Sequence, residues 1–243
     1  DPDDLWNPKR GMLTVGKGVN KKSGLPFKNT VYRKVKNSGV KYESYVEMYD
    51  DAGERIVSQG ADISLNGDYS LDMPQKSFKF KAKSKYGEKT FKAKLFPDRD
   101  YEEYKSFVLR NSGNDCMWTR LQDGFQSRLM DLFGITVAHQ AWKPYAVYLN
   151  GQYWGHMNLR ERVDEYMVAQ FEGINLEDAD QLDLLQANSK AKSGSNTEYK
   201  AMIKKIKAGK PDRKQEDLQY ILDNVDVDNY FEFMAFEMFF GNS

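Results

Sequence analysis

The sequence has little cysteine and little histidine, and each shortage argues against a class of protein or site. One cysteine, Cys116, cannot form a disulfide within the chain, which argues against a disulfide-stapled scaffold although not against export. Two histidines, His139 and His156, cannot build a usual zinc site with that single cysteine. Cys116 also has no convincing histidine partner in the sequence, so nothing indicates a cysteine nucleophile.

Long apolar runs and an excess of charge are absent as well. No run approaches the roughly 18 apolar residues of a membrane span. The first residues, DPDDLWNPKR, show no signal-peptide pattern. The 36 Lys and Arg residues balance 36 Asp and Glu residues, so the net charge gives no argument for nucleic acid or an anionic membrane. We therefore expect no nucleic-acid partner and no membrane span.

The residues that are present favour an α+β fold. Hydrophobic residues make up 40% of the 243 residues and aromatic residues 14%, enough for one large domain or a domain with two lobes. The patterning predicts a β-rich N-terminal lobe, residues 1–110, followed by a hairpin and a mainly helical part, residues 111–243. The expected strands are residues 11–15, 30–35, 41–49, 55–65, 76–83, 89–96, 105–110, 141–149 and 152–159.

Helical spacing of apolar residues begins after residue 119. Thr119 is a candidate N-cap, and Gly134 ends the first helix. Further helices are expected over residues 161–172, 196–208, 213–223 and 228–240, and the stretch NSKAKSGSN, residues 188–196, is typical of a mobile loop. The last helix, NYFEFMAFEMFF, is apolar nearly all round, which predicts a fully buried helix. Because a chain end prefers the surface, we expect the natural protein to continue beyond it.

The stretch YLNGQYWGHMNLRERVDEYM combines a hairpin with the start of a helix. Asn150-Gly151 is a strong hairpin signal because both turn residues accept a positive φ. Glu161 follows the second strand, at an expected first helical turn, where a carboxylate favourably meets the helix dipole. The alternative is a buried Glu161 paired with a Lys or Arg from the neighbouring strand, an ion pair that holds a phosphate-binding cation in place, as in phosphoryl transfer.

A lysine-rich strand precedes that hairpin. Residues 75–94 hold eight lysines and one acidic residue, with Phe78 and Phe80 on one face and lysines on the other. For most of these lysines, a solvated strand face that resists edge pairing is the better explanation. Lys76 is the best candidate for a phosphate site, because it starts the strand directly after the turn-like Met73-Pro74-Gln75.

The stretch LRNSGNDCMWTR, residues 109–120, places a polar loop between a strand and a helix. Ligands collect at such junctions because backbone N–H groups point outward, and an arginine binds phosphate in a bidentate way. The loop offers Arg110, Asn111, Asp115 and Arg120. A loop in which Asp115 and Arg120 only pair or cap is an equally good reading. None of the motifs GxxxxGK[ST], GxGxxG and GxSxG occurs, and DNVDVDN, residues 223–229, suits helix capping better than calcium binding.

These stretches, in this order, resemble the CotH family of spore-coat-protein-H-like atypical kinases. The matching text is PQKSFKFKAKSKYG, SFVLRNSGND, YAVYLNGQYWGHMNLRERVDEYM, GSNTEYKAMI and VDVDNYFEFMAFEMFFGN, over about residues 61–242. The resemblance implies ATP-dependent phosphorylation of protein Ser or Thr with Mg²⁺, on a remote variant of the protein-kinase fold. It implies a protein substrate such as a coat or surface protein, and a location in a bacterial spore coat, outside the cell or at its surface.

Carried onto this sequence, the resemblance makes Lys76 and Arg110 phosphate-side nucleotide-binding candidates and Glu161 their partner. Tyr148 or Trp154 would flank the adenine. The catalytic and metal-binding aspartates of the family pattern are expected after Ser243, so we expect residues 1–243 alone to have no kinase activity. The alternative is a non-catalytic binding or structural module of a spore-coat, cell-surface or cellulosome-like assembly. Its contact would use aromatic residues such as Trp118, Trp142, Tyr153 and Trp154.

Overall fold

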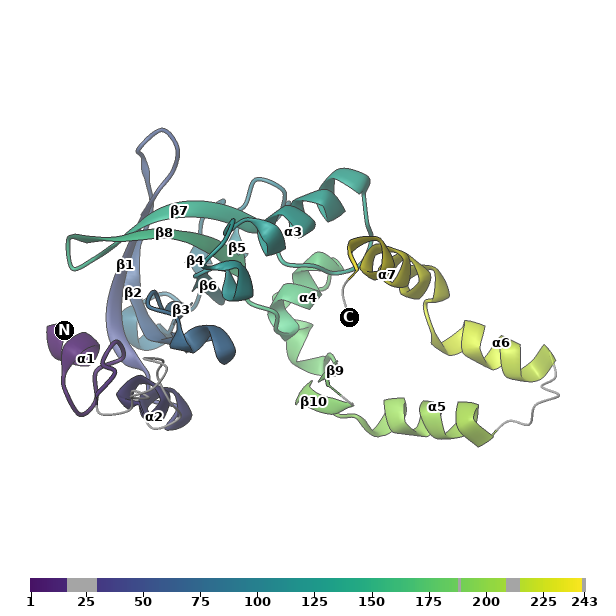
Figure 1. Cartoon of the computed structure of the whole chain (residues 1–243). Coiled ribbons are helices and arrows are strands. Elements are labelled where there is room, and N and C mark those ends of the chain that lie inside the picture. The colour runs from purple at the N-terminus through teal and green to yellow at the C-terminus, as the bar shows by residue number, and fades with distance from the viewer. Residues whose placement is uncertain (17–29, 188, 209–214, 242–243) are drawn as a thin grey trace. The chain divides into compact units, whose positions relative to one another are not determined.

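The computed structural model describes residues 1–16, 30–187, 189–208 and 215–241 (Figure 1). The helices are α1 (Pro2–Trp6), α2 (Val31–Asn37), α3 (Gln122–Phe133), α4 (Glu165–Phe171), α5 (Thr197–Ala208), α6 (Gln215–Asn224) and α7 (Val227–Phe240), with 3-10 turns η1 (Tyr69–Asp72), η2 (Ser84–Tyr86), η3 (Gly113–Asp115) and η4 (Leu176–Gln181). The strands are β1 (Tyr42–Tyr49), β2 (Arg55–Asn66), β3 (Ser77–Lys81), β4 (Phe91–Lys92), β5 (Glu103–Tyr104), β6 (Ser106–Arg110), β7 (Trp142–Leu149), β8 (Gln152–Glu161), β9 (Leu184–Gln186) and β10 (Lys190–Ser193). The expected α+β class with a β-rich N-terminal part is confirmed.

The chain forms two compact units. The first unit contains Asp1–Leu129 and Gln140–Arg162, and the second contains Met130–His139 and Val163–Ser243. The large sheet lies in the first unit, whereas α4 to α7 and the β9–β10 hairpin lie in the second. The hairpin β7–β8 therefore packs with the N-terminal strands. A domain boundary after residue 110 stays a prediction.

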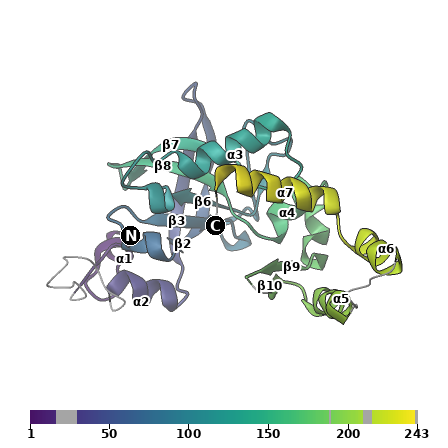
Figure 2. The same ribbon diagram turned by 45° about the vertical axis from the view of Figure 1, so that its right-hand side comes forward.

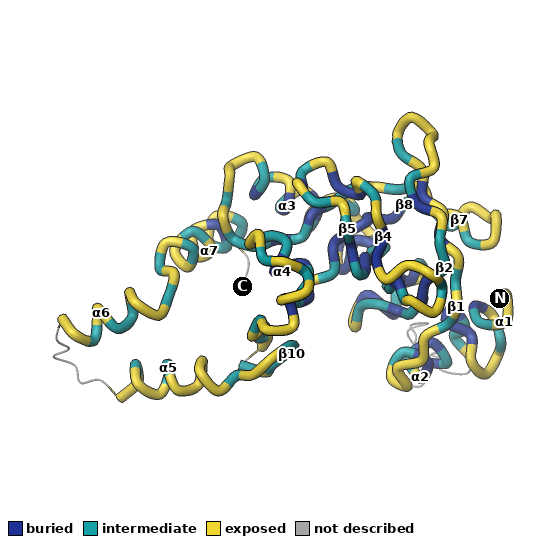
Figure 3. Tube along the Cα trace, turned by 180° about the vertical axis from the view of Figure 1, so that it is seen from behind, coloured by how far each residue is buried: buried dark blue, intermediate teal, exposed yellow. Residues whose placement is uncertain are grey.

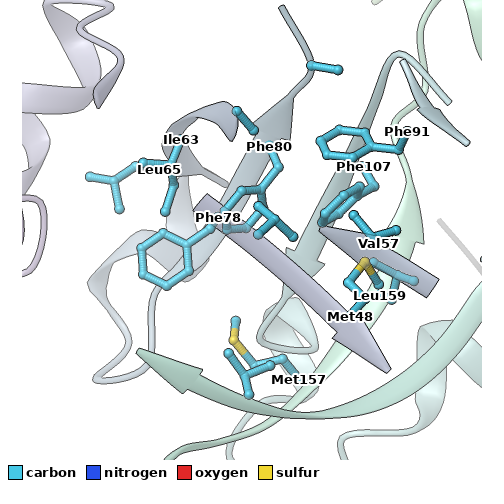
Figure 4. Close-up of a cluster of buried hydrophobic side chains, with 14 of the residues drawn as sticks. Met48, Val57, Ile63, Leu65, Phe78, Phe80, Phe91, Phe107, Met157 and Leu159 are labelled. Atoms are coloured by element: carbon cyan, nitrogen blue, oxygen red, sulfur yellow. The ribbon is translucent and has the colours of Figure 1, made fainter. Parts of the chain in front are cut away.

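The main sheet has six antiparallel strands in the order β1-β2-β3-β6-β8-β7. Its register places Phe80 opposite Phe107 and Phe107 opposite Glu161, so these three residues share one face. That face is the core, where Phe78, Phe80, Phe107 and Leu159 pack together (Figure 4). On the opposite face, helix α3 covers the end of β6 and the strands β7 and β8 (Figure 2).

The expectation of a strand over residues 30–35 is wrong, because these residues begin helix α2. Thr30 caps this helix by accepting a hydrogen bond from the Arg33 backbone N–H at 3.4 Å. Tyr32 and Val35, three residues apart, both enter the core, which a strand would place on opposite faces. Residues 11–15, also expected as a strand, form turns and irregular structure. Only Phe91–Lys92 of the expected strand 89–96 is a strand, and the rest is loop.

The other expected strands agree with the structure within a few residues, and so do the expected helices after residue 119. Helix α3 begins at Gln122, three residues after the candidate cap Thr119, and α4 begins at Glu165 rather than near residue 161. The expected mobile loop at residues 188–196 instead contains β10, which pairs with β9. Asn188 and Arg213, at the edges of two expected elements, lie outside the described residues.

Helix α7 is not the fully buried helix that its composition predicts. Only Phe236 is buried, and Phe231, Met238 and Phe239 are largely exposed. The tube over α7 is mostly coloured as exposed or intermediate (Figure 3). Composition indicates what a helix would gain from burial, but burial also needs packing partners on every side. Among the described residues, no helix combines the length and the apolar content that a membrane crossing requires.

Candidate functional site

The candidate site lies between the end of strand β6 and the first turn of helix α3. Arg110 is the last residue of β6, and its Nε donates to Asp123 Oδ2 at 2.6 Å. Asp123 is the second residue of α3, the next α-helix in the chain. Both side chains are about one third exposed, so the ion pair borders solvent. A strand arginine and a helix carboxylate thus hold each other at the edge of the sheet.

A second arginine, Arg160, also contacts the Asp123 carboxylate. Arg160 in β8 lies with its Nη1 3.4 Å from Asp123 Oδ2, and its Nη2 donates to Ser127 Oγ at 2.8 Å. Arg160 is only 4% exposed. Burial lowers the pKa of Arg160, while the charge of Asp123 opposes that shift. Asp123 therefore serves two arginines with a single oxygen.

The charge and the hydrogen bonds of this site are unbalanced. Two guanidinium groups face one carboxylate, which leaves an excess positive charge. Within the described residues, Arg160 Nε, Trp142 Nε1 and Asp123 Oδ1 are buried without a hydrogen-bond partner. Buried polar groups are normally paired, and unpaired donors beside an excess positive charge suit an anion. Arg110 is the donor of this set that borders solvent, and a guanidinium group in that position is able to bind an anion.

The loop between β6 and α3 is held by buried hydrogen bonds. Asn111 is fully buried and donates from Nδ2 to Ser70 O at 3.1 Å and to Gln75 O at 2.7 Å. Asp115 caps the helix start by accepting from the Gln122 backbone N–H at 3.0 Å. Arg120 donates from Nη2 to Gln75 Oε1. Asp115 thus has a capping role, Arg120 pairs with a glutamine, and Arg110 is the loop-side arginine that faces the site.

Lys76 lies in a different environment from Arg110. It is 3% exposed, and its Nζ donates to Met73 O at 2.6 Å and lies 4.1 Å from the centre of the Tyr32 ring. Burial lowers the pKa of Lys76 to about 8. Helix α2, which precedes the lysine-rich strand in the chain, therefore packs its Tyr32 ring against the Lys76 amine.

Glu161 is buried and is paired with Arg99 rather than with Lys76 or Arg110. Its Oε2 accepts from Arg99 Nε at 3.0 Å and from the Ala141 backbone N–H at 2.8 Å, and Tyr101 donates to its Oε1. Glu161 is 2% exposed. Burial and the negative charge of Glu161 raise the pKa of Tyr101. Of the two interpretations of Glu161, the structure has the buried ion pair, but its cation comes from the loop between β4 and β5 and not from the neighbouring strand.

The expectation that Lys76 and Arg110 converge on Glu161 is wrong, and strand geometry explains why. Arg110 lies one residue after Leu109 and three after Phe107, so it points to the face opposite Glu161. Lys76 precedes Phe80, the residue in register with Phe107 and Glu161, by four positions, or roughly 13 Å of strand. The three residues therefore have separate partners, and their nucleotide-binding roles stay predictions.

The aromatic candidates divide into exposed and packed residues. Tyr148 is 62% exposed at the tip of the β7–β8 hairpin and lies 5.4 Å, ring centre to ring centre, from Tyr153, which is also exposed. Trp154 packs on Trp6, with ring centres 6.0 Å apart. Trp118 is 82% exposed on the loop before α3. The role of Tyr148 or Trp154 beside adenine stays a prediction.

Two residues of the site, Asp123 and Arg160, were not among the sequence candidates. Asp123 looked like an ordinary acidic residue of a first helical turn. Arg160 was visible in Arg160-Glu161-Arg162, and alternation along β8 was the signal that separates it from Glu161. Among the described residues, no group of three or more His, Cys, Asp or Glu side chains is placed to hold a metal ion.

Comparison with known proteins agrees with the motifs in the sequence. The family model described as CotH kinase protein matches residues 63–243, which is most of the chain. The matched region contains β3, β6, α3 and β8, and therefore all residues of the Arg110–Asp123–Arg160 site. No curated protein matches the chain. The chain therefore belongs to the CotH kinase protein family.

Proposed function

We propose that this chain is the nucleotide-binding module of a CotH-like protein kinase that transfers the ATP γ-phosphoryl group to protein Ser or Thr. In this proposal Arg110 binds the ATP phosphates. The observation that carries it is the Arg110–Asp123 ion pair, backed by the buried Arg160. In protein kinases a strand lysine binds phosphates and pairs with a glutamate of the helix that follows. Strand β6 and helix α3 supply an arginine and an aspartate in the same chain order.

Each residue has a defined task in this proposal. Arg110 is the solvent-bordering cation, so it contacts phosphate oxygens directly. Asp123 holds the Arg110 guanidinium at its Nε, which leaves the other nitrogens available for a bidentate contact. Arg160 adds a second positive charge beside Asp123. Because the Arg160 side chain is buried, solvent screens this charge less. Lys76 and Glu161, both buried and bonded within the protein, support the sheet on its core face.

ATP would supply the transferred phosphoryl group and Mg²⁺ the charge that neutralises it. Catalysis of such a transfer depends mainly on positioning and on charge stabilisation. In this proposal the cations that contact phosphate belong to residues 1–243, and the catalytic aspartate of the family pattern would lie after them. We therefore expect residues 1–243 to bind nucleotide and to transfer no phosphoryl group. The acceptor would be a coat or surface protein of a bacterial spore coat or cell surface.

ATP binding to residues 1–243 tests the proposal directly. Titration calorimetry with and without Mg²⁺ should give a measurable Kd, and Arg110→Ala should weaken it about tenfold or more, because hydrogen bonds to charged groups contribute about 1.5–3 kcal/mol. Arg55→Ala is the matched control, since Arg55 is also a strand arginine paired with a carboxylate, Glu47, at 3.0 Å. Equal losses in both variants, or no binding by the unmodified chain, would contradict the proposal.

A carbohydrate-binding or structural module is the second candidate. The exposed pair Tyr148 and Tyr153 favours it, because solvent-exposed aromatic faces suit sugar rings. Thermal unfolding with oligosaccharides and with ATP separates the two functions, since a ligand that binds the native state raises the unfolding midpoint. A shift with oligosaccharide alone, abolished by Tyr153→Ala, would support this second function instead.

A further inference from the structure

Gly124, next to Asp123 in helix α3, lies where the helix touches the sheet most closely. A Cβ atom at this position would lie 2.5 Å from both Cε2 and Nε1 of Trp142. The φ of Gly124 is not among the positive values of the chain, so its backbone conformation does not require glycine. Glycine also costs helix stability relative to alanine. The reason for glycine here is therefore the space taken by the indole ring.

Trp142, which limits the approach of Gly124, also lies opposite Arg160, one of the two arginines that contact Asp123. It is the first residue of β7 and lies in register with Arg160 of β8, so both side chains point to the face that α3 covers. The indole thus lies under Gly124 beside the Arg160 side chain. The distance from α3 to the sheet at this point determines how far Asp123 reaches toward Arg110 and Arg160.

We propose that Gly124 and Trp142 are positioning residues that seat helix α3 at the depth where Asp123 reaches both Arg110 and Arg160. An ordinary van der Waals contact of 3.4–4 Å in place of 2.5 Å would move α3 by about 1 Å. The Arg110–Asp123 hydrogen bond of 2.6 Å would then leave hydrogen-bond range, and the Arg160–Asp123 ion pair of 3.4 Å would lengthen beyond about 4 Å. For its ligand readout, this inference rests on the proposed function.

The first test measures the Arg110–Asp123 pair without any ligand. A double-mutant cycle of Arg110→Ala and Asp123→Asn, followed by denaturant unfolding, gives the coupling between the two residues. We expect Gly124→Ala to reduce this coupling factor at least threefold. Gln122→Ala is the control, because Gln122 is exposed on the same helix and its change leaves the contact with Trp142 intact.

The second test asks whether a smaller partner restores the site. Trp142→Leu in the Gly124→Ala background should recover most of the Arg110–Asp123 coupling. It should also recover the ATP affinity, which we expect Gly124→Ala alone to weaken about tenfold. A purely structural role would give additive losses instead. If Gly124→Ala is more stable than the unmodified chain and keeps its coupling, helix propensity alone acts at this position and the proposal is overturned.

The two readouts separate this proposal from the proposed function. If the unmodified chain does not bind ATP but the coupling falls in Gly124→Ala, the positioning role stands and the nucleotide function fails. If ATP binds and Gly124→Ala changes neither coupling nor affinity, the nucleotide function stands and the positioning role fails.

Discussion

The neighbouring charged residues Arg160 and Glu161 follow from the alternation of strand β8, which ends at Glu161. In β8, Arg160 points to the face covered by α3, whereas Glu161 points to the core face and meets Arg99. On one face of the strand Arg160 thus contacts helix α3, and on the other face Glu161 contacts the loop between β4 and β5. The buried carboxylate of Glu161 stabilises the loop that carries Arg99 and Tyr101, and it is separated from the nucleotide candidate Arg110 by the sheet itself.

Glu161→Gln should therefore destabilise the fold and leave ATP binding at the proposed Arg110 site unchanged. Glu161 accepts hydrogen bonds from Arg99, Tyr101 and the Ala141 backbone, and removal of one partner from a buried ion pair is strongly destabilising, so we expect a loss of about 3–5 kcal/mol in the free energy of unfolding. Denaturant unfolding measures this loss, and the exposed Glu47→Gln should cost less than about 1 kcal/mol. A Glu161→Gln chain that is fully stable but binds ATP more weakly would return Glu161 to the nucleotide site.

Lys76 should make the stability of the protein depend on pH in an unusual direction. Its folded-state pKa of about 8 lies below its ordinary value of 10.5 because burial disfavours the charged amine. Between these values the unfolded chain binds more protons at Lys76 than the folded chain, so the free energy of unfolding rises with pH. Below pH 8 both states are protonated, and the cost of burying the charge is fully present.

The measurement is denaturant unfolding at several pH values between 7 and 9.5. Relative to Lys76→Met, the unmodified chain should gain about 1 kcal/mol or more across this range, because one full proton contributes roughly 1.4 kcal/mol per pH unit. The exposed Lys34→Met should show the same pH profile as the unmodified chain. Parallel profiles for Lys76→Met and the unmodified chain would show that Lys76 is not desolvated.

At the scale of single elements, the sequence predicted the features that depend on residues adjacent in the chain. The Asn150-Gly151 turn was evident from the sequence, and its residues adopt φ values of 50° and 77°. Helix α2 was missed because β-branched and aromatic residues in Val31–Val35 favour a strand by local preference, while burial of Tyr32 and Val35 favours a helix. The Arg99–Glu161 pair joins residues 62 positions apart, and no local pattern contains such a contact.

The turn of the β7–β8 hairpin allows a direct test at this scale. Gly151→Ala forces a residue with a Cβ atom into a positive φ of 77°. We expect a loss of about 1 kcal/mol in the free energy of unfolding, measured by denaturant, because a Cβ atom disfavours this region by roughly that amount. Gln152→Ala, beside the turn and exposed, should change stability by less than about 0.5 kcal/mol. Equal effects of the two changes would show that the turn does not constrain the hairpin.

At the scale of the whole molecule, the hydrophobic core includes residues that lie before the region matched by the family model. The match begins at residue 63, but the core also contains residues from α1, α2 and the segment between them. The sequence predicted the CotH region from motifs, whereas this earlier part carried no motif and could be assigned only by its packing. Its contributions to the core are Leu5, Met12, Leu13, Tyr32 and Val35.

Removal of residues 1–40 should therefore prevent stable folding of the remaining chain. Each buried side chain of this size contributes about 1.5–3 kcal/mol through the hydrophobic effect, so the loss of five approaches the whole stability of a typical domain, about 5–15 kcal/mol. Urea unfolding of the shortened chain should show no cooperative transition. Two point variants on α2 test the cause: Tyr32→Ala, at a fully buried position, should cost about 3–5 kcal/mol, and exposed Lys34→Ala less than 0.5 kcal/mol or so. A shortened chain that unfolds cooperatively with unchanged stability would mean that the CotH region supports its core without α1 and α2.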